Sequence, residues 1–303
     1  MPRKIAVLAG FLAALTAAAL LIVWRSGRVE RETPLRGIKP GEAVEIILER
    51  DSSKIVFERK GGQWRLTAPV RDEADQGAVD DLASGLRALT LGSEVSREVD
   101  NYVAYDLNES SATRVRLFVS GRAAASLDGY FGKAGLGYDS LYFRFAGEKP
   151  VYLTTGVAAY RLNHGAEDFR QRALFDIDRD AILRISARSA DSSFEIAKTS
   201  GGWTSTPKGL ASDKTEQAVS KLAALRAASF ALGAETSAET GFDKPLLSVE
   251  ISGSVKAAKF TVGKPRVEKS GKPLYRYVRV DGRPAVLLVP AADVEAIIGL
   301  FGN

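Results

Sequence analysis

The sequence predicts an α+β protein with two tandem repeat units, each a mainly antiparallel sheet with one main helix packed on it, behind one transmembrane helix. The first observation is a self-match. The stretch from Gly61 to Pro69 returns as Gly201 to Pro207, and 139 residues separate Trp64 from Trp203. The second is that an amphipathic helix pattern opened by an aspartate, Asp75 or Asp213, follows each copy. A self-match with this spacing indicates a duplicated structural unit.

The amino-acid composition limits the classes of protein to which the chain can belong. The chain has 303 residues, of which 45% are hydrophobic and 26% charged, and this is the composition of a globular protein large enough for two domains. Its net charge of +5 comes from residues 1–40, so the remainder is balanced and predicts no nucleic-acid partner. The absence of cysteine excludes disulfides, thiolate metal sites and cysteine nucleophiles. No cofactor is predicted.

The N-terminal segment predicts a membrane anchor over residues 1–26. Ile5 to Trp24 carries no charge, and a helix of that length spans about 30 Å, the thickness of a bilayer core. The alternative is a cleaved signal peptide, since small residues between Leu15 and Ala19 have cleavage-like spacing. The apolar run is longer than a signal core of about 7–15 residues, which favours the uncleaved anchor. Residues 27–41 are polar and predict a tether.

The orientation of that anchor rests on two opposed signals. The basic residues that follow the apolar segment would keep the large domain in the cytoplasm. A very short N-terminal tail before a signal-like helix instead favours translocation of the rest of the chain. We therefore expect a single-pass protein of the inner membrane with its C-terminal domain in the periplasm.

The first unit is predicted over residues 42–165. Strand patterns bounded by turn residues precede and follow one helix, Asp75 to Leu89, which has a single apolar face. Pro69 stops the third strand, and a short helical piece closes the unit at 157–162. The expected strands are 44–49, 54–59, one starting at Trp64, 113–119, 124–131, 141–145 and 151–154.

The second unit is predicted over residues 166–303 and repeats this order. Asp213 with Glu216 resembles a capping box that starts the main helix, and a closing helix runs from Pro290 to Phe301. The expected strands are 182–185, 194–197, one at the Trp203 turn, 248–251, 259–262, 275–280 and 285–289.

Several of these motifs resemble the family called domain of unknown function 4340. The similar features are the Gly-Trp turn with a proline after it, Gly241 to Pro245 before a strand, Phe260 to Gly263, and the Arg-rich Asp168 to Arg172. The first unit departs from the family's Gly-Leu-Asp-x-Pro corner, with Tyr105 to Asn108 in that place. The resemblance implies a bacterial envelope accessory protein with an N-terminal membrane helix, often encoded beside gliding-motility-type ABC transporters. It supplies no catalytic residues.

Motifs with candidate chemistry are few. His164 is the only histidine, and the sequence has no Gly-x-Ser-x-Gly elbow that would hold a serine nucleophile for it. A solvated or capping role is therefore favoured over that of a general base. Asp176, Asp178 and Asp180 alternate as in a calcium loop but lack its glycine and glutamate, which favours a turn. Gly132 to Gly137 has no helix pattern after it and predicts a hairpin rather than a phosphate loop.

Two further groups have both a structural and a functional interpretation. Trp64 and Trp203 are predicted to pack under the helix of each unit rather than to stack on a ligand. A group of arginines between the units is a candidate surface for an anionic lipid head group or an acidic partner, although ion pairs with Glu167, Asp168, Asp176 and Asp178 are favoured. These arginines are Arg161, Arg170, Arg172, Arg179 and Arg184.

The expected function is therefore a membrane-anchored, non-catalytic accessory or scaffold protein of an ABC-type transporter permease or another envelope complex. The alternative is an envelope enzyme, such as a hydrolase with paired carboxylates about 5–10 Å apart, or a ligand-binding protein.

Overall fold

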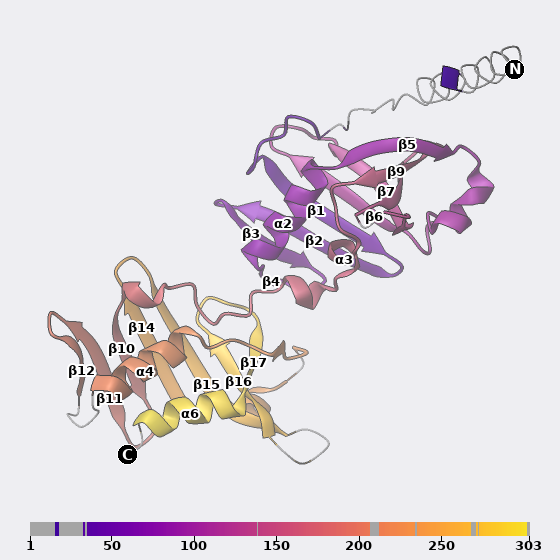
Figure 1. Cartoon of the computed structure of the whole chain (residues 1–303). Helices are drawn as coiled ribbons and strands as arrows, with labels where there is room; N and C mark the ends of the chain where they lie inside the picture. The colour runs from indigo at the N-terminus through magenta and orange to yellow at the C-terminus, as the bar shows by residue number, and fades with distance from the viewer. Residues whose placement is uncertain are drawn as a thin grey trace, which may run out of the picture. The chain divides into compact units, whose positions relative to one another are not determined.

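The computed structural model describes residues 16–17, 33, 35–137, 139–206, 212–233, 235–267, 271 and 273–301 (Figure 1). Within these ranges the strands form two mainly antiparallel sheets accompanied by a few helices, which confirms the α+β class. No helix among these residues has the length and apolarity needed to cross a membrane. The predicted anchor, Ile5 to Trp24, lies outside the described residues apart from Thr16 and Ala17, and the repeat marker Pro207 also lies outside them.

The chain divides into two compact units. Unit 1 comprises the described residues of Met1–Lys54 together with Asp81–Asn163, and unit 2 comprises Ile55–Asp80 together with His164–Asn303. The division falls inside one strand and one helix, so a segment early in the sequence belongs to the unit that also holds the C-terminal half.

Unit 1 contains six antiparallel strands in the order β1-β6-β7-β8-β9-β5. Alternation produces the clearest of them: along β6 every second side chain is buried, as expected for a strand with one face on a core. The strands are β1 (Ala43–Arg50), β5 (Thr90–Ser96), β6 (Thr113–Val119), β7 (Leu127–Ala134), β8 (Leu141–Phe145) and β9 (Val151–Thr155). The 3₁₀-helix η1 (Val99–Tyr105) and the short helix α3 (Ala159–Asn163) complete the unit.

The first part of unit 2 is a small antiparallel group with the order β4-β3-β2. Its strands are β2 (Ser53–Lys60), β3 (Gln63–Ala68) and β4 (Asp72–Glu73). Gly61 and Gly62, both at positive φ, form the turn between β2 and β3, and only glycine adopts two such conformations in succession without strain. Helix α2 (Gln76–Arg87) begins directly after this group.

The larger part of unit 2 is an eight-stranded antiparallel sheet in the order β12-β11-β10-β14-β15-β16-β17-β13. Helices α4 (Ser212–Ala223) and α6 (Ala291–Phe301) lie on one face, as Figure 1 shows. Their apolar residues, among them Val219, Leu222, Val294 and Ile297, join the strands in one buried core. The strands are β10 (Ile182–Arg188), β11 (Ser193–Thr199), β12 (Gly202–Thr206), β13 (Ser229–Phe230), β14 (Leu247–Gly253), β15 (Ala257–Val267), β16 (Pro273–Val280) and β17 (Val286–Pro290).

The structure corrects several predicted bounds. The strand expected at 124–131 begins at Leu127, because the residues after Gly121 extend the turn. Pro290 is the last residue of β17, and the closing helix starts one residue later, at Ala291. Strands β4, β5 and β13 and the short helices η2 (Ala166–Phe169), η3 (Arg179–Ala181) and α5 (Ser237–Thr240) were not predicted.

Candidate functional site

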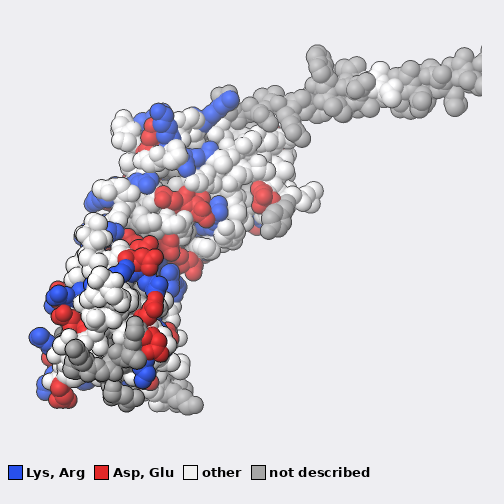
Figure 2. Space-filling model, turned by 60° about the vertical axis from the view of Figure 1, so that its left-hand side comes forward, with Lys and Arg blue, Asp and Glu red and all other residues white. Residues whose placement is uncertain are grey.

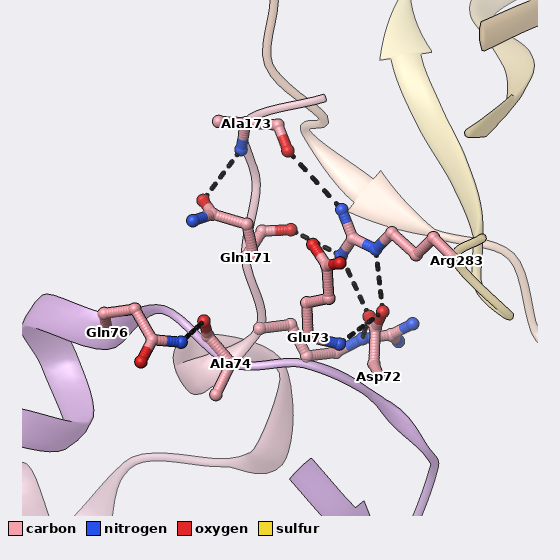
Figure 3. Close-up of polar contacts among 8 residues, drawn as sticks. Asp72, Glu73, Ala74, Gln76, Gln171, Ala173 and Arg283 are labelled. Carbon is pink, nitrogen blue, oxygen red and sulfur yellow. Dashed lines mark hydrogen bonds and ion pairs between the residues drawn. The ribbon is translucent and has the colours of Figure 1, made fainter. Parts of the chain in front are cut away.

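A buried ionic group of unit 2 surrounds Asp72, whose side chain is 0% exposed. Arg283 donates from Nε to Oδ1 of Asp72 at 2.7 Å and from Nη2 to Oδ2 at 3.0 Å. Arg170 donates from Nε to the same Oδ2 at 2.7 Å, and the backbone N–H of Glu73 donates to Oδ1 at 2.8 Å. Figure 3 shows Arg283 pointing at the carboxylate from a different part of the chain. Every acceptor direction of the carboxylate is occupied by a donor.

The two arginines have further partners that fix their positions. Arg283 also donates from Nη2 to the carbonyl of Gln171 at 2.6 Å and from Nη1 to that of Ala173 at 3.4 Å (Figure 3). The guanidinium of Arg170 lies 3.5 Å from the ring centroid of the buried Phe230. Cation–π contact is strongest where the cation is desolvated, so Phe230 adds to the stability of the group. We call Asp72, Arg170 and Arg283 the Asp72 cluster.

An irregular segment, residues 170–174, brings these groups together. It forms an isolated antiparallel bridge from Arg170 to Ala74 and another from Ala173 to Arg226. Backbone hydrogen bonds from Asp75 to Phe169 and from Gln171 to Glu73 extend the first bridge. The Asp72 cluster therefore joins three segments that are 98 and 211 residues apart in sequence.

Two opposed effects set the pKa of the Asp72 carboxyl. Burial alone would raise it, but the hydrogen bonds and charge of Arg283, followed by those of Arg170, outweigh burial and hold the pKa below its ordinary value. Asp72 is therefore ionised at neutral pH, and its role is to accept hydrogen bonds rather than to donate or remove protons.

This lowered pKa predicts a specific loss of stability in acid. A carboxyl whose pKa is lower in the folded state stabilises the fold above its unfolded pKa of about 3.9 and loses that contribution as the pH falls through the folded pKa. We expect the urea midpoint of the wild type to decline more steeply below about pH 4 than that of Asp72→Asn, which has no titrating group there. Parallel declines in the two proteins would contradict this assignment.

A half-open pocket of about 440 Å³ adjoins the cluster within unit 2. Four carboxylates line it, and two of them have structural partners. Asp75 accepts from the backbone N–H of Ala78 at 3.1 Å at the start of α2, and Asp176 pairs with Lys256 at 2.7 Å. The other two are Glu73 and Asp281. The volume lies in the range of small-molecule sites.

The five predicted surface arginines have acceptors other than those expected. Arg161 of unit 1 pairs with Asp81 at 3.2 Å, and in unit 2 Arg170 pairs with Asp72. Arg172 donates to the carbonyl of Ala228. Arg179 pairs with Glu216 at 2.9 Å, and Arg184 lies 3.6 Å from Glu195. The expectation of ion pairs with Glu167, Asp168, Asp176 and Asp178 was therefore wrong, because acceptors on neighbouring strands and helices lie closer.

Trp64 and Trp203, which each follow a glycine turn, differ in burial. Trp64 is 1% exposed, and its Nε1 donates to Asp80 at 2.8 Å. The Gln76 side chain accepts a hydrogen bond from the backbone N–H of Trp64 through Oε1 and donates one from Nε2 to the Trp64 carbonyl. These two bonds connect β3 to the start of α2. Trp203 is half-buried against the core of the eight-stranded sheet, and Nζ of Lys198 lies 5.8 Å from its ring. Trp64 therefore packs against helix α2, as the sequence predicts.

The other motifs lie in turns and short helices. The His164 ring meets Phe169 edge-on at 5.5 Å. Asp178 caps η3 by accepting from the N–H of Asp180. Gly135 and Gly137 lie in the turn from β7 to β8. Among the residues that the structure describes, no group of three or more His, Cys, Asp or Glu side chains is placed to hold a metal ion.

A polar row crosses the sheet face of unit 2 that α4 and α6 leave uncovered. Cross-strand pairing aligns Thr206, Glu195, Ser186, Glu250 and Lys259 on five adjacent strands. Their sequence neighbours, such as Ile185 and Ile196, are buried in the core, so the row points away from it. A hollow of about 600 Å³ lies over this row.

The charged surface of the molecule is mixed. On the face drawn in Figure 2, basic and acidic side chains are interspersed.

Comparison with known proteins identifies one family. The model of the family described as a domain of unknown function (DUF4340) matches residues 64–245, more than half of the chain. No curated protein and no solved structure matches the chain.

Proposed function

We propose that this chain, which belongs to the DUF4340 family, is a non-catalytic accessory protein of the bacterial cell envelope. In this proposal the apolar segment from Ile5 to Trp24 anchors it in the inner membrane, and the two units lie in the periplasm. It binds the permease of an ABC-type transporter or another envelope protein. The resemblance of its motifs to proteins encoded beside such transporters supports this choice of partner.

The state of Asp72 supports the non-catalytic part of the proposal. Among the described residues of unit 2, Asp72 is the most deeply buried acid, and all the hydrogen-bonding capacity of its carboxylate joins parts of the chain. A catalytic acid or base needs a proton that it can exchange with substrate at the working pH. Asp72 is therefore an ionised structural group and not the acid or base of a reaction.

Site-specific cross-linking in cells tests the partner. A photo-activated residue at Ser186 lies in the polar row, and the matched control at Gln217 lies on the exposed side of α4. We expect Ser186 to give an adduct with a transporter permease, identified by mass spectrometry, and Gln217 to give none. Adducts with glycan fragments alone, or the same adducts from both positions, would contradict the proposal.

The absence of cysteine makes the topology easy to test. A single Val255→Cys substitution places a thiol on a side chain that is 90% exposed in unit 2. We expect a membrane-impermeant maleimide to label it once the outer membrane is permeabilised, and N-terminal sequencing to show an uncleaved chain. Labelling only after lysis of the inner membrane would place the units in the cytoplasm instead.

The 440 Å³ pocket favours a second candidate, an envelope hydrolase or a small-ligand receptor. Glu73 and Asp281 are the carboxylates that an acid–base mechanism would use there. Assays of purified protein on envelope glycans, with Glu73→Gln and Asp281→Asn as variants, distinguish the candidates. Turnover that both variants abolish would replace the accessory role by catalysis.

We further propose that the two halves are copies of one ancestral unit. The strand order β1-β6-β7-β8-β9-β5 has the same pattern as β10-β14-β15-β16-β17-β13. The hairpins β2–β3 and β11–β12 each precede a helix of 12 residues. Gly132 in β7 and Gly263 in β15 share a further feature, because a backbone carbonyl oxygen occupies the space that a Cβ atom would need. This oxygen belongs to Tyr105 at Gly132 and to Thr240 at Gly263.

This shared close approach predicts matched effects of substitution. A Cβ at Gly132 or Gly263 would come closer to that carbonyl than side chains tolerate, so each alanine variant should lose about 1–3 kcal/mol of unfolding free energy. Gly201→Ala is the control, since nothing lies within 4 Å of its Cβ position. Chemical denaturation measures all three, and a neutral Gly132→Ala beside a damaging Gly263→Ala would contradict the common ancestry.

A further inference from the structure

An open pocket of about 310 Å³ lies among residues that all belong to unit 1. Three parts of the chain line it: the turn from β1 to β2, the turn that contains Glu109, and two side chains on neighbouring strands, Arg114 of β6 and Tyr130 of β7. Its volume is at the lower end of the range for small-molecule sites, about 300–1,000 Å³. It shares no residue with either hollow of unit 2, and the proposed function does not use it.

The ring of Tyr130 is held between two arginines. The register of the sheet places Arg114 of β6 and Arg144 of β8 on either side of Tyr130. Their guanidinium carbons lie 5.5 Å and 3.9 Å from the centroid of the ring. Because cations occupy both sides of the ring, a ligand cannot stack on it. The hydroxyl is therefore the group that Tyr130 offers to the pocket.

This hydroxyl is left without a partner by the residues that the structure describes. Tyr130 is 9% exposed, and its oxygen forms no hydrogen bond with any residue of the described ranges. Buried tyrosine hydroxyls usually find a hydrogen-bond partner. Since the phenol oxygen can both donate and accept, an unpartnered hydroxyl on the wall of a pocket points to a polar ligand.

Most of the charged residues around the pocket already have partners inside unit 1. Glu49 pairs with Arg116 at 2.8 Å and with Lys54 at 3.5 Å. Arg114 donates from Nε and Nη2 to the two carboxylate oxygens of Asp128, at 2.9 Å and 2.8 Å. These groups are therefore held by one another rather than available to a ligand.

Asp51 and Glu109 are the two remaining acids. Both are exposed, and neither side chain forms an ion pair or a hydrogen bond with a residue in the described part of the chain. Asp51 has a φ of 55° in the turn from β1 to β2. Across the Glu109 turn, Oδ1 of Asn108 accepts from the backbone N–H of Ser111 at 2.9 Å. With its ion pairs counted, the pocket has one more acid than base, so its field favours a cation.

We propose that this pocket binds a small primary amine. The ammonium group donates to the carboxylates of Asp51 and Glu109 and to the hydroxyl oxygen of Tyr130. A primary ammonium has three N–H donors and no acceptor, so these three acceptors satisfy it. A calcium ion fits less well, because it takes about 6–8 oxygen ligands and the described residues place no group of three or more acidic side chains for a metal. The site needs neither the anchor nor a protein partner, so it stands apart from the proposed function.

Ligand-observed NMR with the full chain in a neutral detergent tests the site. Ethanolamine is the probe. Choline is its matched control, because it has the same charge and hydroxyl but a quaternary nitrogen without N–H donors. We expect saturable magnetisation transfer from the protein to ethanolamine and about tenfold or weaker binding of choline, which loses the charge-assisted hydrogen bonds. High salt should weaken the binding of ethanolamine by screening.

Three variants test the acceptors one at a time. Tyr130→Phe keeps the ring between its arginines and removes the hydroxyl, and one hydrogen bond to a charged group is worth about tenfold in affinity. Asp51→Asn and Glu109→Gln should each weaken binding by a similar factor, and asparagine tolerates the positive φ of the turn. Asp100→Asn is the control, because it removes an exposed carboxylate of unit 1 that does not line the pocket. Melting temperatures equal to that of the wild type show that a weakened variant is folded.

Four results would overturn the amine site. A lack of saturable transfer to ethanolamine would leave the pocket without this class of ligand. Equal binding of choline and ethanolamine would show that N–H donors are not recognised. Wild-type affinity in Tyr130→Phe would place the ammonium group away from the hydroxyl. Displacement of ethanolamine by calcium chloride, but not by sodium chloride of the same ionic strength, would assign the pocket to a metal ion.

Discussion

Replacing Asp72 by asparagine is expected to lower the free energy of unfolding by about 3–5 kcal/mol. The variant keeps the shape of the side chain but leaves Arg283, 1% exposed, and Arg170, 9% exposed, as buried cations without a counter-charge. A typical domain is stable by only about 5–15 kcal/mol, so the variant should be close to unfolding at 37 °C. Urea denaturation followed by circular dichroism measures the change.

Two further variants make this prediction specific. Asp176→Asn breaks an ion pair whose side chains are both largely exposed, and it should cost less than about 1 kcal/mol. The triple variant Asp72→Leu, Arg170→Leu, Arg283→Met removes every charge of the cluster and should recover much of the stability, because apolar packing often replaces a buried ion group without loss. If Asp72→Asn and Asp176→Asn behave alike, the cluster does not stabilise the fold as described.

Truncating Trp64 to alanine is expected to cost about 3–5 kcal/mol, the usual range for deleting a fully buried aromatic side chain. The ring is enclosed between β3 and α2, and its Nε1 donates to Asp80, so the variant loses both packing and a hydrogen bond. Trp203→Ala, at the half-buried counterpart, should cost about 1–2 kcal/mol.

Trp64→Phe separates packing from hydrogen bonding. It retains most of the apolar volume, and since Asp80 can turn to water, a loss of only about 1 kcal/mol is expected. Melting temperatures of Trp64→Ala, Trp203→Ala and Trp64→Phe, measured in the same buffer, rank the three losses of stability. A larger loss for Trp203→Ala than for Trp64→Ala would contradict the burial of the two rings.

Local patterns were sufficient to predict most of the strands. β6 and β8 have the predicted bounds, because alternation of polar and apolar side chains is a property of the strand itself. β5 was missed because Thr90–Ser96 has a glycine and few apolar residues, and its pairing with β9 reaches about 60 residues along the chain. Strands of two residues, such as β4 and β13, have no periodicity to detect.

The Asp72 cluster was not predictable in the same way. Arg170 was recognised as a candidate, but its acceptor was expected among nearby acids rather than 98 residues earlier. No local signal marks Asp72 or Arg283, since a charged residue in a short polar stretch of sequence is ordinarily solvated. Their burial is a product of tertiary structure, which places a turn of β16–β17 against the segment after β3.

The separation between Asp72 and Arg283 also affects when the chain can fold. A ribosome adds about 5–20 residues per second, so the 211 residues between them take about 10–40 s to make. During that time the carboxylate has no guanidinium from Arg283 to join, and the segment around β3 and β4 stays incomplete. A chain that is exported before it folds would be spared this waiting period in the cytoplasm, where proteases and chaperones compete for unfinished proteins.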